Sequence, residues 1–227
     1  MPDADMNEAD IIELRVERPA NGGEAVGRGP DGRVVFVRGA IPGERVTARL
    51  TDTGRAAFWR AQTLDVIEVS PHRVDPVCPA AARGAGCCDL SFIAPDAARE
   101  YKAAAAADVL TRIGRLPAEL LTQWGLPSGT GDPGVPSGVA ARVVSLADDP
   151  TGWRVRTRLA VDAAGRAGLR VAGGAAIVTG SPCAQSMPGT FDGLDARRFT
   201  PAAELAVVVD DTGSRHITEV APVAAGR

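Results

Sequence analysis

Apolar and charged residues alternate along the first third of the chain with the period of two that half-buried β-strands show. The runs with this pattern are 11–18 and 45–51; the short apolar run at 33–38 is a further expected strand, and a longer extended segment lies at 57–69. Asp31-Gly32 and Pro42-Gly43 lie on either side of the run at 33–38 and are typical turn pairs, because such residues suit the backbone angles of tight turns. Short strands joined by glycine-rich turns predict a small five-stranded barrel of the OB type.

A helical pattern replaces this alternation between residues 94 and 116. Pro95-Asp96 is a start signal, the alanine-rich stretch after it has the highest helix propensity, and Gly114 is the expected end. Residues 117–139 are rich in Pro, Gly and Ser, which predicts a loop or a linker.

Strand patterns return in the last third of the chain. Residues 153–161 alternate basic and apolar side chains, a turn follows at 162–165, and a return strand is expected from Gly168. Strands at 205–209 and 216–220 predict a second hairpin. The fold class is therefore mainly β with one long helix, an α+β arrangement in which an antiparallel-sheet domain follows the barrel.

Composition restricts the function only weakly. The 227 residues, 45% of them hydrophobic, suffice for one large domain or two small ones, and the net charge of −3 favours no partner. Lys102 is the only lysine, so arginine supplies nearly all the positive charge. Arginine binds phosphate and stacks on bases better than lysine does, but genome-wide codon bias is the simpler explanation for most of this excess.

The start of the chain and its apolar runs predict a cellular location. Residues 1–10 are polar and acidic and are expected to be disordered. No apolar run approaches the roughly 20 residues that a membrane span needs. We therefore expect a soluble, cytoplasmic protein, in which the four cysteines are thiols or metal ligands rather than structural disulfides.

The segment 21–46 resembles a known RNA-binding domain. Its order G-x-A-V-G-R, then D-G-R-V-V-F-V-x-G-A-I-P-G-E-x-V, is similar to the TRAM domain, an OB-like barrel, in the version that opens RNA (uracil-5-)methyltransferases. The match runs from Glu13 to Pro76 and closes with S-P-H-R-V-D-P. The run that begins at Trp153 resembles the central domain of the same family. The resemblance implies a TRAM barrel at 11–76, a cysteine segment and helix at 77–116, and a central β domain at 138–227.

OB-like barrels bind single strands by stacking bases on aromatic rings and following phosphates with basic groups. The candidates on the barrel are Arg33, Arg38, Arg45, Arg49, Phe58 and Arg60. On the later strand, Arg154, Arg156 and Arg158 are expected to share one face and to form a phosphate track. For each arginine the alternative is an ordinary solvated residue. Phe36 is expected in the core rather than on the binding surface.

Cys78, Cys87, Cys88 and Cys183 stand where the methyltransferase family carries a four-iron cluster, so the resemblance implies that these four are its ligands. The spacing departs from the family's C-P-x4-C-G-G-C pattern, because Cys87 and Cys88 are adjacent and Gly84-Ala85 stand where a middle cysteine is expected. An unusual cluster, one spare cysteine and a lost cluster all remain open. Zinc on four thiolates is the next alternative, and free buried thiols are the simplest.

We therefore expect the RNA-binding and iron–sulfur portion of a tRNA or rRNA (uracil-5-)methyltransferase. The doubly wound domain for S-adenosylmethionine and the cysteine nucleophile of that family are not visible, so no catalytic residue is assigned and the chain alone is expected to be inactive. His72 and His216 lack the partners of a catalytic triad. The alternatives are a stand-alone TRAM module and, less favoured, an unrelated zinc-stapled β protein. RNA is the expected partner of a monomer, without DNA or membrane.

Overall fold

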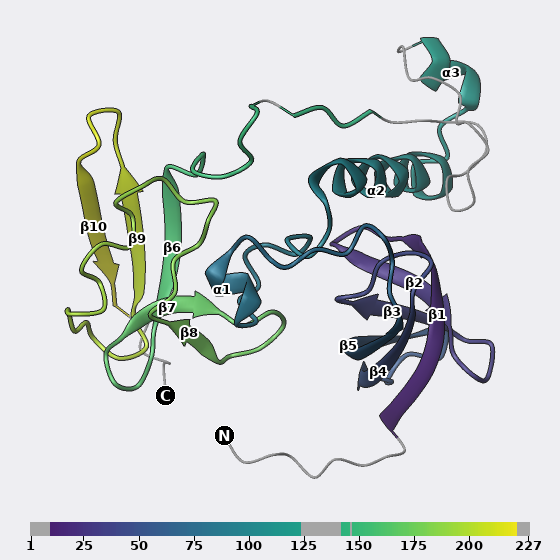
Figure 1. Ribbon diagram of the computed structural model, residues 1–227, viewed down its shortest axis with the longest axis horizontal. Helices are drawn as coiled ribbons and strands as arrows, with labels where there is room; N and C mark the ends of the chain where they lie inside the picture. Colours follow the sequence, from purple (N-terminus) through teal and green to yellow (C-terminus); the bar gives the residue numbers. More distant parts are fainter. Residues whose placement is uncertain (1–9, 124–141, 146, 222–227) are drawn as a thin grey trace, which may run out of the picture. The chain divides into compact units, whose positions relative to one another are not determined.

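The computed structural model describes residues 10–123, 142–145 and 147–221. The chain forms two compact units (Figure 1). Unit 1 comprises Met1–Val74 and Phe92–Val144, and unit 2 comprises Asp75–Ser91 and Ser145–Arg227. The cysteine segment therefore belongs to the unit with the later strands, and the long helix belongs to the unit with the barrel.

Unit 1 contains a closed five-stranded barrel, as the alternation predicts. Its strands are β1 (Ile11–Pro19), β2 (Glu24–Arg28), β3 (Val34–Arg38), β4 (Arg45–Asp52) and β5 (Phe58–Glu68). They pair in the order β1-β2-β3-β5-β4, and β4 closes the barrel on β1. All these pairs are antiparallel except β3 with β5.

The pattern of alternation does not single out β2, because this strand is short and contains glycine. Gly27 is required there: a Cβ at this position would lie 2.4 Å from the carbonyl oxygen of Arg15 on β1. The register between β1 and β2 shifts between Val16 and Arg18, where the two backbones approach closely. The Asp31-Gly32 turn joins β2 to β3 as predicted, with Gly32 at a φ of 81°.

The barrel core consists of aliphatic side chains that alternate with outward-facing residues. Val35 and Val37 on β3 and Val46 and Ala48 on β4 are fully buried. Phe36 lies between the two buried valines and is only partly buried on the opposite side of the strand. The prediction that Phe36 belongs to the core is therefore wrong, because barrel closure turns the side of β3 with Val35 and Val37 inward and leaves Phe36 on the other side.

One charged side chain is buried with this core. Glu44, which follows the Pro42-Gly43 turn, has no exposed surface. Its carboxylate accepts hydrogen bonds from the backbone N–H groups of Ile41 (2.8 Å) and Ser70 (3.1 Å). It also accepts two bonds from the Arg73 guanidinium, at 2.7 and 2.6 Å. The chain that leaves the barrel is thus attached to the turn between β3 and β4.

The long helix follows this attachment. The Arg73 guanidinium lies 4.8 Å from the centre of the Phe92 ring, and the Ala94 N–H donates to the carbonyl of His72. Helix α2 (Pro95–Asp108) begins there and continues into a π-helical turn (Val109–Ile113) that ends at Gly114, as predicted. Asp108 forms an ion pair with Arg18 of β1 at 3.4 Å.

The predicted linker at 117–139 contains a short helix, α3 (Ala118–Gln123), and its remainder lies outside the described residues. Among the helices that the structure describes, none combines the length and the apolar character needed to cross a membrane.

Unit 2 is a five-stranded sheet with one short helix, α1 (Pro79–Ala82). The strands are β6 (Arg156–Val161), β7 (Ala167–Arg170), β8 (Ile177–Thr179), β9 (Glu204–Val209) and β10 (Arg215–Val220). They pair in the order β10-β9-β6-β7-β8, and every pair is antiparallel, which confirms the predicted fold class. The exact boundaries of the predicted domains stay a prediction.

One face of this sheet is buried. Leu159 of β6, Leu205 and Val207 of β9 and Leu169 of β7 pack against the loops that carry Cys78 and Cys183. The residues that alternate with them point away from this core. The sheet therefore has one core face and one open face.

The buried ion pair of unit 1 predicts a large loss of stability when Glu44 is replaced by Gln. The amide leaves the Arg73 guanidinium without its charged partner, and breaking a buried pair costs about 3–5 kcal/mol. Chemical unfolding followed by circular dichroism measures the loss. Glu68→Gln is the matched control, because Glu68 pairs with Arg15 and Arg45 at the surface, where such pairs contribute about 0–1 kcal/mol. Equal losses in both variants would contradict the prediction.

Candidate functional site

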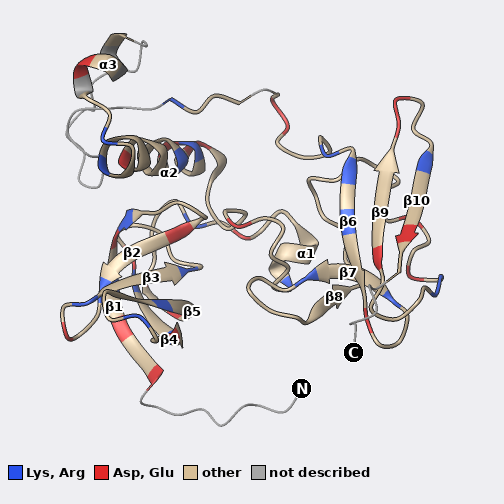
Figure 2. Cartoon of the chain, turned by 180° about the vertical axis from the view of Figure 1, so that it is seen from behind, with Lys and Arg blue, Asp and Glu red and all other residues tan. Residues whose placement is uncertain are grey.

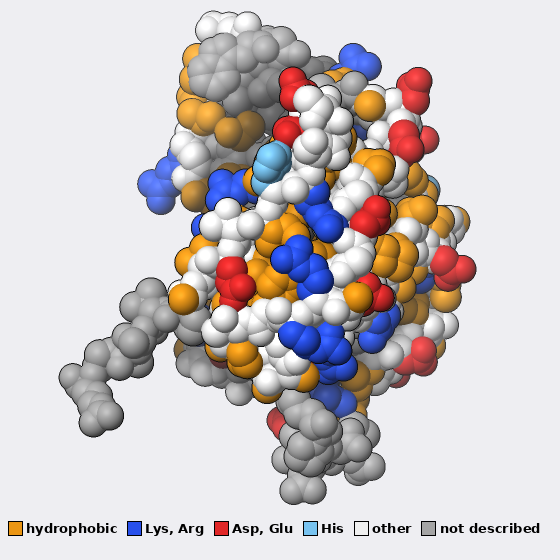
Figure 3. Space-filling model, turned by 90° about the vertical axis from the view of Figure 1, so that its left-hand side faces the viewer, with side chains coloured by type: hydrophobic (Ala, Val, Ile, Leu, Met, Phe, Trp, Pro, Cys, Tyr) orange, Lys and Arg blue, Asp and Glu red, His pale blue; other side chains and the backbone are white. Residues whose placement is uncertain are grey.

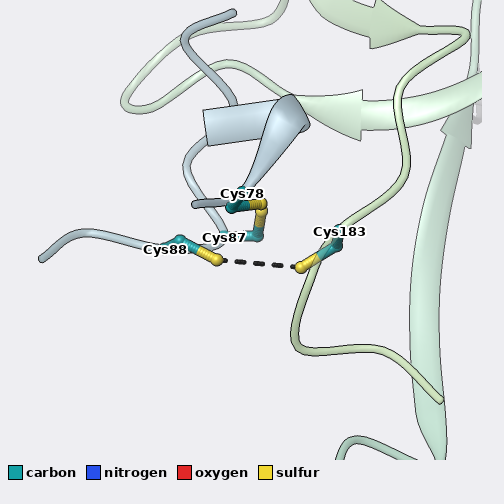
Figure 4. Close-up of side chains that lie close together, drawn as sticks. All are labelled: Cys78, Cys87, Cys88 and Cys183. Carbon is teal, nitrogen blue, oxygen red and sulfur yellow. Dashed lines mark hydrogen bonds between the residues drawn. The ribbon is translucent and has the colours of Figure 1, made fainter. Parts of the chain in front are cut away.

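All four cysteines meet at one place in unit 2 (Figure 4). Cys78 precedes helix α1, Cys87 and Cys88 follow it, and Cys183 comes from the connection between β8 and β9. The four Sγ atoms all lie within 4.8 Å of one another, and those of Cys88 and Cys183 are 3.7 Å apart. Cys78 and Cys183 are buried, whereas Cys87 and Cys88 are partly exposed.

Hydrogen bonds connect the segment around Cys78 and α1 with the segment around Cys183. The N–H of Ala80 in α1 donates to the carbonyl of Pro182 (3.2 Å), and the N–H of Ala184 donates to the sulfur of Cys78 (3.4 Å). Arg83 donates to the carbonyl of Thr179 (2.7 Å) and to the hydroxyl of Ser181 (2.8 Å). Segments about a hundred residues apart in sequence are therefore joined at the sulfurs.

Hydrogen bonds between the thiols shift their pKa values in opposite directions. Hydrogen bonds from the Cys87 and Cys88 thiols, together with one from the backbone N–H of Gln185, hold the pKa of Cys183 well below its usual range. The same bond to Cys183 raises the pKa of Cys87 and of Cys88, and burial adds to both shifts.

Four thiolates are the donor set of both structural zinc sites and iron–sulfur clusters. The sequence left open whether one cysteine is spare, and the structure places all four in the group. The adjacent Cys87 and Cys88 both contribute a sulfur. The centre can therefore bind a metal or a cluster.

The loop between α1 and the cysteine pair is attached to the end of β7. The Gly86 N–H donates to the carbonyl of Arg170 (2.9 Å), and the Ala172 N–H donates to the carbonyl of Gly84 (3.1 Å). A Cβ on Gly86 would lie 2.8 Å from the Cα of Ala172, so only glycine fits this contact. At Gly84, where the family pattern expects a cysteine, φ is 88° and a Cβ would meet no atom within 4 Å.

On unit 1, aromatic and basic residues gather on the outer face of β3 and β5. The rings of Phe36 and Phe58 meet edge to face, with centres 5.3 Å apart. The Arg60 guanidinium lies 5.5 Å from the Phe36 ring and 5.8 Å from the Phe58 ring, and Arg55 lies 5.4 Å from Phe58. Arg60 also forms an ion pair with Glu24 at 2.5 Å.

The register extends this face with further basic residues. Gln62 of β5 is paired with Arg38 on β3 and with Arg49 on β4, so the three side chains stand in one row on the outside of the barrel. The neighbouring row contains Phe36 and Arg60. Four of the predicted residues, Arg38, Arg49, Phe58 and Arg60, therefore share one surface with Phe36. We call the surface formed by these five residues the barrel face.

Two predicted residues of the barrel lie elsewhere. Arg33 precedes β3 and covers the ring of Trp59 at 4.3 Å, on the inward side of β5. Arg45 forms ion pairs with Glu13 (2.7 Å) and with Glu68. Neither side chain belongs to the barrel face.

In unit 2, basic residues lie on the open face of the sheet. Arg156 and Arg158 of β6 are exposed there, and the register places Arg170 of β7 beside Arg158. Glu204 of β9 pairs with Arg158 at 3.7 Å and with Arg170 at 3.8 Å. Figure 2 shows the basic positions on β6 and β7, and basic side chains form a band on the face of unit 2 in Figure 3.

Arg154 does not share this face. β6 begins only at Arg156, and Arg154 lies before a bend, where it donates to the side chain of Gln185 (2.7 Å) and covers the Trp153 ring at 5.1 Å. The expectation of three arginines on one strand face is therefore met by two. Arg170 takes the third place, which only the strand pairing reveals.

Sequence reasoning also missed Phe36 as a surface aromatic. Phe36 belongs to the continuous apolar run at 34–37, so no polar residue marks which side of this strand faces outward. Whether the valines or the phenylalanine face inward depends on barrel closure, because both sets are apolar.

Comparison with known proteins agrees with these features. Residues 7–62 match the model of the TRAM domain. An uncharacterized RNA methyltransferase of Corynebacterium efficiens is 39% identical over the whole chain, and one of Streptomyces coelicolor is 38% identical over 70% of it. The 23S rRNA (uracil(1939)-C(5))-methyltransferase RlmD of Shewanella halifaxensis is 39% identical over 36% of the chain and 18% of its own length. The chain spans 49% of the C. efficiens relative and 33% of the S. coelicolor relative.

The close contact at Gly86 predicts that Gly86→Ala disturbs the cysteine centre. The added methyl group forces the loop away from Ala172, and such overpacking costs about 1–3 kcal/mol. Thermal unfolding measures this cost, and alkylation of the metal-free thiols, followed by mass spectrometry, reports whether they become more reactive. Gly174→Ala is the control, since its Cβ would meet only Val171 at 3.8 Å. Unchanged stability and thiol reactivity in Gly86→Ala would show that the loop position is not important.

Proposed function

We propose that this chain, a TRAM-containing homologue of RNA methyltransferases, is the RNA-binding portion of a tRNA or rRNA (uracil-5-)methyltransferase. The observation that carries the proposal is the barrel face, where two aromatic rings lie among arginines on adjacent strands. The uracil C5 specificity rests on the name of one relative that matches part of the chain.

The barrel face has the two elements that single-stranded RNA requires. Phe58 and Phe36 offer ring surface on which a base can stack, worth about 1–3 kcal/mol per base. Arg60, Arg38 and Arg49 offer charge for the phosphates on either side. Arg33 and Arg45, which lie off this face, stay predictions as RNA contacts.

The open face of unit 2 is a second RNA contact in this proposal. Arg156, Arg158 and Arg170 stand on neighbouring strands, so their charges add along one line. Arg154 is retained as a contact at the end of this line. In both units an acidic residue, Glu24 or Glu204, already pairs with the arginines, and phosphate has to compete with it.

The cysteine centre has a structural part in the proposal, because it joins the 75–91 segment to the sheet. The methyltransferase resemblance implies a four-iron cluster as its occupant. S-adenosylmethionine belongs to a catalytic domain, and the elements between residues 10 and 221 that the structure describes form no doubly wound α/β domain. A monomeric state and a cytoplasmic location stay predictions.

The proposed RNA contact predicts that Phe58→Ala weakens binding of single-stranded RNA by roughly 5- to 150-fold, the equivalent of one lost stacking partner. Arg60→Gln should weaken binding and reduce the salt dependence of log K by about 0.7, because one phosphate contact is lost. Glu24→Gln should tighten binding, since it releases Arg60 from its ion pair. Fluorescence anisotropy with a labelled oligonucleotide, repeated at several salt concentrations, measures all three.

Arg15→Gln is the matched control for the arginine variant. Arg15 lies on β1 and is paired with Glu68, away from the barrel face. If Arg15→Gln and Arg60→Gln reduce affinity equally, binding follows total charge and the barrel face is not the site. Circular dichroism of each variant shows whether the barrel stays folded.

The alternative is a stand-alone TRAM module that binds RNA without chemistry. A methyl-transfer assay with S-adenosylmethionine and unmodified tRNA or rRNA distinguishes the two, because the proposal expects transfer only when a catalytic domain is joined to this chain. Activity of a longer protein that contains these residues, lost in its Phe58→Ala variant, would support the methyltransferase reading. RNA binding with no transfer in any longer form would support the module.

A further inference from the structure

We infer that the four cysteines bind one tetrahedral metal ion, zinc by its chemistry, rather than a four-iron cluster. The inference rests on the spacing of the sulfur atoms and does not depend on the proposed RNA function. Figure 4 shows the four side chains close together, with the sulfurs of Cys88 and Cys183 facing each other across the dashed line.

A single ion places its ligands at a defined separation. Zinc binds thiolate sulfur at about 2.3 Å in a tetrahedron, so the sulfurs stand roughly 3.8 Å apart. The Sγ atoms of Cys88 and Cys183 are 3.7 Å apart, and every other pair lies within 4.8 Å. The group therefore needs shifts of about an ångström at most to coordinate one ion.

A four-iron cluster makes a different demand. Each thiolate binds its own iron, and the four irons and their inorganic sulfides occupy the space between the cysteines. Sulfurs must then stand much further apart than around a single ion. Cys88 and Cys183 are instead in direct sulfur–sulfur contact, and Cys78 and Cys183 are packed into the unit 2 core, which resists expansion.

The surroundings also suit a structural ion. The N–H groups of Ala184 and Gln185 are directed at the sulfurs of Cys78 and Cys183, and such bonds stabilise thiolates. Four protein ligands close the coordination shell, as in structural zinc sites. No oxidant or reductant is needed, because the ion only displaces thiol protons into solvent.

The test is the metal content of the full chain, produced with both iron and zinc supplied and purified without oxygen. We expect about one zinc per chain and no acid-labile sulfide. Replacement of the ion by cobalt(II) should give the intense visible absorption of tetrahedral thiolate coordination. Removing zinc with a chelator should lower the unfolding temperature of unit 2, because a structural zinc contributes directly to folding.

Two cysteine variants and one control make the test specific. Cys88→Ala changes a partly exposed ligand, so it should stay folded and lose more than the 10–100-fold in zinc affinity that an outer-shell partner costs. Cys183→Ala should lose the ion as well. Thr218→Ala, which changes an exposed residue of β10, keeps all four thiols and should bind normally.

Several results would overturn the inference. About four irons with about four sulfides per chain would establish the cluster, and a folded wild-type protein that binds neither metal would establish free thiols. Full zinc binding by Cys88→Ala would show that Cys88 is not a ligand. RNA affinity of the same preparations is read separately, so failure of the metal site is distinguishable from failure of the proposed function.

Discussion

The buried carboxylate of Glu44 is the contact on which the arrangement of unit 1 depends. A charge without exposed surface requires compensation, and here it comes from the turn at Ile41, the amide of Ser70 and the guanidinium of Arg73. Arg73 in turn covers the Phe92 ring, close to the start of α2. One side chain therefore determines where the chain leaves the barrel and where the long helix begins.

In unit 2 a returning chain segment is attached to the sheet through cysteine sulfur atoms. Its sheet buries one face, and the 75–91 segment packs into that core through Cys78, Ala80 and Ala85 and meets Cys183 at the cysteine centre. A metal ion at this point contributes binding free energy to folding. The two units thus use different chemistry, a buried ion pair and a thiolate centre, to attach a returning chain segment to a β-structure.

The proposed RNA contact has to form without a net positive charge on the chain. The net charge is −3, and many arginines are paired with carboxylates, such as Arg60 with Glu24 and Arg158 with Glu204. Local surfaces, rather than the total charge, must then attract phosphate. In the proposed contact, stacking of bases on Phe36 and Phe58 adds a contribution that salt does not screen.

The sequence by itself determined the barrel, the long helix, the later hairpins and the identity of the four sulfur donors, because these depend on local periodicity, turn residues and residue chemistry. Tertiary structure decided which face of β3 points outward, so that Phe36 lies on the barrel face and not in the core. It also moved Arg154 off the strand and placed Arg170 beside Arg158. Strand pairing and closure join residues far apart in the chain, and the alternation along one strand carries no information about its neighbours. The cysteines are likewise far apart in the chain, so the sequence does not determine the spacing of their sulfur atoms. Packing of α1 against the β8–β9 connection sets this spacing, which in turn decides between one ion and a cluster.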